Sequence, residues 1–131
     1  MIGYQMVGSN QYEKAIAYYD ALLGELGATR MMEEKGKFVA WSQGDSATQA
    51  TAFCVCKPDD NKEASVGNGV MTAFSAPDAK KVDALYAKAI ELGGTCEGKP
   101  GPRGEGGFYA GYCRDLDGNK FNFFCIQDAN G

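Results

Sequence analysis

The chemistry open to this chain is limited first by what its sequence lacks. There is no histidine, so no imidazole can serve as a general base, activate a nucleophile or bind a metal. Five cysteines remain as candidate nucleophiles or soft ligands: Cys54, Cys56, Cys96, Cys113 and Cys125. Their odd number, with no apolar leader segment before them, predicts free thiols in a reducing cytoplasm.

Cys54 and Cys56 are the cysteine pair with the most suggestive spacing. They are two residues apart on a predicted strand, so both side chains leave the same face. One interpretation is a thiolate pair for soft-metal or redox chemistry, and the other is burial in the core or in a pocket wall. A metal site needs more ligands, and a nucleophilic thiol needs an activating group that histidine cannot supply here. We therefore expect Cys54 and Cys56 to lie in the core or in a pocket wall. We expect Cys96, Cys113 and Cys125 to be packing residues.

The overall composition excludes several function classes. The chain has 131 residues, a net charge of −4 and 44% hydrophobic residues. This predicts one folded domain, 1–131, without the clustered basic patch of a nucleic-acid-binding surface. No apolar run approaches the roughly 20 residues of a membrane-spanning helix. We expect neither nucleic-acid nor membrane partners.

The order of predicted elements repeats within the chain. Glu25–Thr29 and Glu91–Thr95 are near-identical segments, and each follows an amphipathic helical pattern. Strand, helix and three strands are predicted in 1–58 and again in 67–127, joined by a polar linker at 59–66. The pattern predicts an α+β fold of two βαβββ modules, whose sheets join into a cup with the helices outside.

Finer features of the second repeat complete this prediction. Pro77 is expected in the first turn of the second helix. Gly98–Gly107, rich in glycine and proline, is expected to be a loop. Asp117-Gly118 marks a hairpin turn between the last two strands.

Four segments in order make the chain similar to a known family. They are the Tyr18-Tyr19 pair in the first helix, Gly67-Asn68-Gly69 before Ala73-Phe74, the loop Gly98–Arg103, and the hairpin Arg114–Lys120. Together they resemble the vicinal oxygen chelate superfamily of glyoxalases, extradiol dioxygenases, and bleomycin- and fosfomycin-resistance proteins. The resemblance covers nearly the whole chain and is closest to a bacterial glyoxalase-like branch.

The resemblance implies a divalent metal bound by His, Glu or Gln at the floor of the cup. By position, three of those ligand slots fall on Tyr4, Met71 and Asn122. The fourth falls within 53–57, where Cys54 and Cys56 are the candidates and no carboxylate occurs. A phenol, a thioether and a neutral amide do not suit a hard divalent ion. The sequence therefore predicts a relative with no metal and no other cofactor.

The same positions then become candidates for a ligand pocket. Tyr4 would stack on a ligand, Met71 would supply an apolar wall, and Asn122 an amide hydrogen bond; alternatively they fill the former metal space as core. Arg103 would bind a carboxylate or phosphate, or else remain a solvated loop charge. One of Tyr109 and Tyr112 would face the pocket, with the strand parity left open. The predicted pocket comprises Tyr4, Cys54, Cys56, Met71, Arg103, Tyr109 and Asn122.

These interpretations lead to a hypothesis about function. We expect a glyoxalase/bleomycin-resistance-like protein that binds a small molecule in the cup without a catalytic metal. A homodimer is implied by the resemblance alone. The alternative is a divergent enzyme of lyase, isomerase or dioxygenase type, which transfers a proton through Tyr4 or a cysteine or binds metal through Gln5, Cys56 or Glu105. A third possibility is a structural protein whose cup is filled by side chains.

Overall fold

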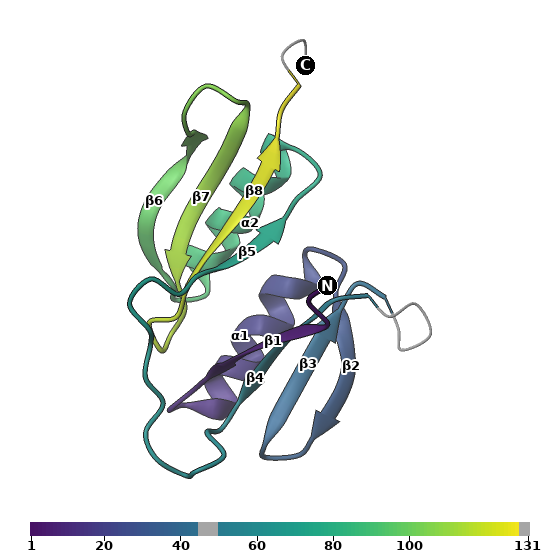
Figure 1. Ribbon diagram of the computed structural model, residues 1–131, viewed down its shortest axis with the longest axis vertical. Coiled ribbons are helices and arrows are strands. Elements are labelled where there is room, and N and C mark those ends of the chain that lie inside the picture. The colour runs from purple at the N-terminus through teal and green to yellow at the C-terminus, as the bar shows by residue number, and fades with distance from the viewer. Residues whose placement is uncertain (45–49, 129–131) are drawn as a thin grey trace. The chain divides into compact units, whose positions relative to one another are not determined.

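Two compact units make up the protein, Met1–Val66 and Gly67–Gly131. The computed structural model describes residues 1–44 and 50–128. Each unit has the order strand, helix and three strands (Figure 1). The predicted α+β fold with two βαβββ modules is therefore confirmed. Within the described ranges, no helix is long and apolar enough to cross a membrane.

The first unit places its last strand beside its first. Its elements are β1 (Tyr4–Gly8), α1 (Tyr12–Gly24), β2 (Thr29–Glu34), β3 (Phe38–Ser42) and β4 (Ala52–Cys56). The sheet order is β1-β4-β3-β2, with β1 parallel to β4 and the other pairs antiparallel. The helical crossover after β1 makes the parallel pairing possible.

The second unit repeats this topology. Its elements are β5 (Thr72–Ser75), α2 (Ala79–Glu91), β6 (Thr95–Pro102), β7 (Phe108–Arg114) and β8 (Lys120–Ile126). The sheet order is β5-β8-β7-β6, again with one parallel pair, β5 and β8.

Two backbone hydrogen bonds align the units residue by residue. Ser9 N donates to Cys56 O at 3.0 Å, and Ala76 N donates to Phe124 O at 2.8 Å. In each unit, the bond joins the residue that follows the first strand to the strand that comes last along the chain, β4 or β8. Counting back two residues from each acceptor makes Cys54 and Asn122 equivalent.

One face of the first sheet is covered by α1. The ring of Tyr19 on α1 lies 5.8 Å from that of Trp41 and 4.9 Å from that of Phe53, between centroids. Trp41 and Phe53 are register partners on β3 and β4, so their side chains share the helix-covered face. The residues that alternate with them along the strands point to the opposite face of the sheet. We call this opposite face the first open face; its residues are Tyr4, Met6, Ala40, Ala52 and Cys54.

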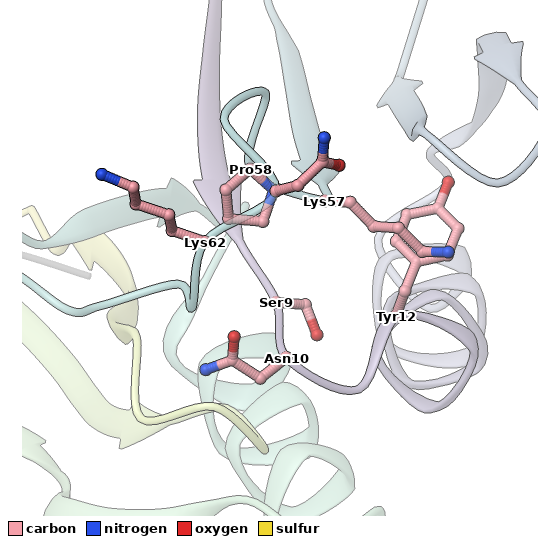
Figure 2. A pocket seen from close by; sticks show the side chains of 7 residues that line it. Ser9, Asn10, Tyr12, Lys57, Pro58 and Lys62 are labelled. Atoms are coloured by element: carbon pink, nitrogen blue, oxygen red, sulfur yellow. The ribbon is translucent and has the colours of Figure 1, made fainter.

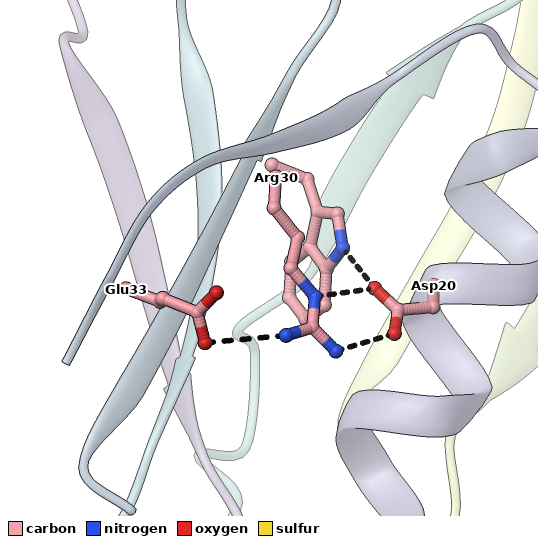
Figure 3. A network of polar contacts seen from close by, with 4 residues as sticks. Asp20, Arg30 and Glu33 are labelled. Carbon is pink, nitrogen blue, oxygen red and sulfur yellow. Dashed lines mark hydrogen bonds and ion pairs between the residues drawn. The ribbon is translucent and has the colours of Figure 1, made fainter. Parts of the chain in front are cut away.

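An ion-pair network ties α1 to this sheet (Figure 3). Arg30 on β2 donates from Nε and Nη2 to both carboxylate oxygens of Asp20 on α1, at 2.9 and 2.6 Å. Trp41 Nε1 donates to Asp20 Oδ1 at 2.8 Å, and Arg30 Nη1 also reaches Glu33 Oε2 at 3.2 Å. The hydrogen bonds from Arg30 are the main reason that the pKa of Asp20 is lowered. The network is thus a structural clamp on the helix-covered face.

The second sheet packs against α2 in the same way. Val82, Leu85 and Ala89 on α2 are fully buried, as the helical periodicity predicts. Tyr109 OH donates to Asp83 Oδ1 on α2 at 2.6 Å, so Tyr109 lies on the helix-covered face. Tyr112, three residues along β7, points to the other face with its register partner Asn122. We call Ala73, Tyr112 and Asn122 the second open face.

Two local predictions for the second unit need correction. β6 extends through Thr95–Pro102, where a loop was expected from Gly98 onward. Gly98 and Gly101 pair with Tyr112 and Ala110 across two register shifts, because an edge strand tolerates glycine, proline and bulges. The second helix is capped by Asp78, whose Oδ1 accepts a hydrogen bond from Lys81 N at 2.8 Å. Pro77 therefore lies before the cap instead of in the first turn.

Candidate functional site

An apolar pocket of about 290 Å³ lies over the first open face. Tyr4, Met6, Ala40, Ala52 and Cys54 from that face line it, and no charged side chain is among its described lining residues. Its other lining residues are Gly3, Met31, Met32, Phe38 and Ala50. Cavities that bind small molecules are typically about 300–1,000 Å³ and mostly apolar, so this pocket suits a small ligand.

A β-bulge explains why neighbouring methionines both line this pocket. The register of β2 on β3 shifts between Arg30 and Met32, which leaves Met31 as the extra residue. Successive residues of a regular strand point to opposite faces, but a bulge locally breaks that alternation. Met31 packs against Ala40, Ala52 and Cys54, while Met32 is in register with Ala40. The result is a flexible thioether wall, which adapts to irregular ligand shapes.

The thiols of β4 are held in their protonated form. Cys54 is buried in the pocket wall, and Cys56 is half-buried two residues further on. Burial raises the pKa of both thiols; the Cys54 pKa is raised further by Cys56, and that of Cys56 by Asp59. The reactive form of cysteine is the thiolate, so these environments favour inert wall groups over nucleophiles.

The second open face is polar where the first is apolar. Asn122 is 1% exposed, and its Oδ1 accepts no hydrogen bond from the described residues. Its register partner Tyr112 has Arg103 at 5.4 Å and Lys120 at 5.8 Å from the ring centroid. A buried amide oxygen without a donor is costly, which makes Asn122 a candidate for a ligand hydrogen bond.

Arg103 and Tyr109 have partners within their own unit. Arg103 Nη2 donates to Lys99 O at 2.6 Å and Nη1 to Gly101 O at 3.0 Å, so its guanidinium folds back onto β6.

The register of β7 settles which tyrosine shares a face with Asn122. Tyr112 lies on that face, whereas Tyr109 faces Asp83 on α2. Of these two tyrosines, Tyr112 is the better candidate for ligand contact.

A second pocket, of about 200 Å³, lies beside the start of α1 (Figure 2). Ser9, Asn10 and Tyr12 line it together with Lys57 and further residues of the segment after β4. The ammonium group of Lys57 lies 5.4 Å from the centroid of the Tyr12 ring. Asn10 Nδ2 donates to Ala64 O at 2.9 Å and Asn10 Oδ1 accepts from Ala64 N at 2.6 Å, which fastens the predicted linker to the first unit.

The residues at the implied metal-ligand positions do not fit a hard divalent ion. The alignment of the units makes Cys54 the counterpart of Asn122, which selects Cys54 for the slot left open in 53–57. Tyr4, Met71, Cys54 and Asn122 then offer a phenol, a thioether, a thiol and an amide. Such ions prefer several carboxylate or carbonyl oxygens. No group of three or more His, Cys, Asp or Glu suited to a metal occurs among the described residues.

Comparison with known proteins identifies the family. The model of the Glyoxalase/Bleomycin resistance protein/Dioxygenase superfamily matches residues 2–123. The chain belongs to this superfamily. No curated protein matches the chain.

Several solved structures are similar to this chain over most of its length. A glyoxalase/bleomycin resistance protein from Albidiferax ferrireducens T118 is 35% identical, with a TM-score of 0.82 over 95% of this chain and 97% of that one. The hypothetical protein SA1046 from S. aureus is 25% identical, with a TM-score of 0.69 over 95% and 91%. A putative glyoxalase from Bacillus halodurans, at 23% identity and a TM-score of 0.71 over 95% and 94%, shares the fold.

Several pocket residues of this superfamily member were missed by sequence reasoning. Met6, Ala40 and Ala52 could have been found, because strand alternation places them on the face of Tyr4 and Cys54. The joint presence of Met31 and Met32 could not, because it depends on a bulge that the sequence does not mark.

Proposed function

We propose that this chain is a small-molecule-binding protein of the glyoxalase/bleomycin-resistance type that needs no catalytic metal. The observation that carries the proposal is the apolar pocket over the first open face. Its wall of alanine, methionine, tyrosine, phenylalanine and cysteine favours an uncharged, largely apolar ligand. A carboxylate or phosphate there would lose its hydration without gaining a cation.

Three features support binding without turnover. The sequence has no histidine. The pocket thiol Cys54 has a pKa raised by burial, so a thiolate nucleophile is disfavoured. The side chains at the implied metal-ligand positions do not suit a hard divalent ion. Asn122, Met71 and Arg103 remain predicted ligand contacts, and the homodimer remains a prediction that light scattering would check.

Paired neutral and charged ligands test the proposal. Isothermal titration with 1-naphthol and with 1-naphthoate compares an uncharged bicyclic probe with its carboxylate analogue. We expect 1-naphthol to bind at least tenfold more tightly, a difference of about 1.4 kcal/mol. Equal affinity, or preference for the carboxylate, would contradict a pocket selective for uncharged ligands.

A blocking variant locates the site. Ala52→Phe adds a ring to the pocket wall and should abolish 1-naphthol binding. Ala87→Phe, at an exposed position of α2, is the matched control and should leave binding unchanged. Melting curves of both variants separate loss of the site from loss of the fold. Undiminished binding by a folded Ala52→Phe variant would place the ligand elsewhere.

The alternative is a divergent enzyme, whose candidate reactive groups include the Tyr4 phenol and the Cys54 thiol that line one pocket. Its metal-dependent form is tested by adding Zn²⁺, Ni²⁺, Mn²⁺ or Fe²⁺ to chelator-treated protein and recording the melting temperature. A ligand that binds the folded state raises stability in proportion to the logarithm of its concentration over Kd. Stoichiometric binding of one metal with stabilisation by several degrees would favour the enzyme. No shift is the outcome expected for the binding protein.

A further inference from the structure

Two cysteines of the second unit lie directly opposite each other on neighbouring strands. Cys96 on β6 and Cys113 on β7 are register partners in an antiparallel pair, so their side chains leave the same face of the sheet. The Cα atoms of such partners are about 4.5–5.5 Å apart. Disulfides span Cα separations of about 4.4–6.8 Å, so the backbone already lies within the bonding range.

The two thiols differ in their access to solvent. Cys96 is exposed, whereas Cys113 is buried and 0% exposed. Burial and the neighbouring Cys96 thiol raise the pKa of Cys113 to about 12. A hydrogen bond with Cys96 raises the pKa of Tyr86, on α2, to about 12. A soluble oxidant would therefore meet Cys96 first, with Cys113 held behind it.

The other cysteines lack this arrangement among the described strands. Cys54 is in register with Met6 and Ala40, Cys56 with Gly8 and Phe38, and Cys125 with Tyr109. Cys54 and Cys56 are on one strand, where residues two apart are about 6.6 Å apart with parallel side chains. That separation is at the limit of disulfide geometry, and the parallel Cβ vectors oppose a bridge.

We propose that Cys96 and Cys113 are a redox modification site that a peroxide converts to an intramolecular disulfide. The Cys96 thiolate attacks one oxygen of hydrogen peroxide, the O–O bond breaks, and Cys96 becomes a sulfenic acid as hydroxide leaves and is protonated to water. The Cys113 sulfur then attacks the sulfenic sulfur. The S–S bond forms, the S–O bond breaks, and the hydroxyl leaves as water with the Cys113 proton. Two thiols and one peroxide give one disulfide and two waters.

The disulfide would alter the part of the second unit that carries Arg103. It closes a covalent ring around the β6–β7 hairpin, and it removes the Cys96 thiol that is hydrogen-bonded to Tyr86. Arg103 lies between these two strands in sequence, with its guanidinium 5.4 Å from the ring of Tyr112. Oxidation would therefore restrict the hairpin beside the second open face, independently of whether the proposed apolar ligand binds the first unit.

Peptide mapping of the full chain tests this site. The reduced protein is treated with hydrogen peroxide, its remaining thiols are alkylated under denaturing conditions, and the digest is analysed without reduction. We expect a peptide linking Cys96 to Cys113, an intact mass lower by two hydrogens before alkylation, and reversal by dithiothreitol. No linked peptide, a stable sulfinic acid at Cys96, or a link between two chains would overturn the proposal.

Matched variants make the assignment specific. Cys96→Ser changes an exposed residue, should fold normally, and should abolish the linked peptide. Cys54→Ser with Cys56→Ser retains both proposed partners and should leave the link unchanged. Cys113→Ala should halt Cys96 at the sulfenic acid, which dimedone traps. If Cys113→Ala does not fold, the first two variants decide the outcome, because a link that survives Cys96→Ser contradicts the proposal.

Discussion

The two units share a fold but present different chemistry on their open faces. In the first, Met6 pairs with Cys54 beneath an apolar pocket. In the second, Ala73 pairs with Asn122, whose neighbour Tyr112 has two cations around its ring. The register of β1 on β4 is equivalent to that of β5 on β8, so at these positions the difference comes from the side chains. A repeated βαβββ scaffold thus fixes where residues point, and individual substitutions decide what each face can bind.

The helix-covered faces differ as well. In the first unit, the aromatic residues Tyr19, Trp41 and Phe53 fill the space between helix and sheet, and Asp20 clamps Arg30. In the second unit, aliphatic residues of α2 cover Phe121 and Phe123, which are almost fully buried. Each unit therefore has a hydrophobic core of its own.

The largest expected effect comes from removing the aromatic core of the first unit. Trp41 is 2% exposed, contacts Tyr19, and donates to Asp20. Trp41→Ala should lower the free energy of unfolding by about 3–5 kcal/mol, because it leaves a cavity and breaks a hydrogen bond. Urea denaturation followed by circular dichroism measures the change. A loss below about 1 kcal/mol would show that the first unit does not depend on this core.

Substitutions at the equivalent residues Cys54 and Asn122 directly test how the open faces of the units differ. Cys54→Asn would bury an amide in an apolar wall and should lower the free energy of unfolding by about 1–3 kcal/mol. Asn122→Leu removes a buried acceptor that has no donor among the described residues, and should raise it by about 1 kcal/mol. Urea midpoints measure both. Destabilisation by Asn122→Leu would mean that the amide has a structural role.

The Asp20–Arg30 pair predicts a pH dependence in the first unit. Because Arg30 lowers the pKa of Asp20 in the folded protein, the pair stabilises the fold above the unfolded pKa of about 3.9. That contribution is lost as the pH falls through the lower folded pKa. Both side chains are about 40% exposed, at 39% and 40%, so we expect Asp20→Asn to cost only about 1 kcal/mol at pH 7.

Urea midpoints of the wild type and Asp20→Asn between pH 7 and pH 2 measure this term. The two proteins should converge in stability as the pH falls below about 4. A difference in stability between the two proteins that stays constant from pH 7 to pH 2 would show that the charge of Asp20 does not contribute to stability.

The helix caps give the smallest expected difference. Gln11 before α1 makes no side-chain cap hydrogen bond, whereas Asp78 before α2 does. Asp78→Ala should cost about 1 kcal/mol, and Gln11→Asp should gain a few tenths of a kcal/mol, about 0.5 at most. Thermal melting compares the two variants with Gln11→Ala as the control. Equal effects of Asp78→Ala and Gln11→Ala would remove this difference between the units.

How far the sequence predicts the site depends on the residue. The sequence predicts Tyr4 and Cys54 as ligand-pocket residues. Both line the apolar pocket of the first unit, and their contact with a ligand stays a prediction. The sequence predicts Tyr109 as the pocket residue without establishing the strand register, and the structure places Tyr112 on the face of Asn122 instead. A shift of one residue reverses the face to which a strand side chain points. The folding of Arg103 onto the carbonyls of β6 has no sequence signal.

The amino-acid sequence is enough to predict the repeat, the order of elements and the helix faces, because these follow from local periodicity and from turn residues such as Asp117-Gly118. It also determined the absence of imidazole chemistry. Contacts across strands are known only from the fold: Met31 and Met32 line one pocket, and Cys96 lies opposite Cys113. The equivalence of Cys54 and Asn122 also depends on the strand registers. Register and bulges arise from pairing between distant segments, so no local pattern encodes them.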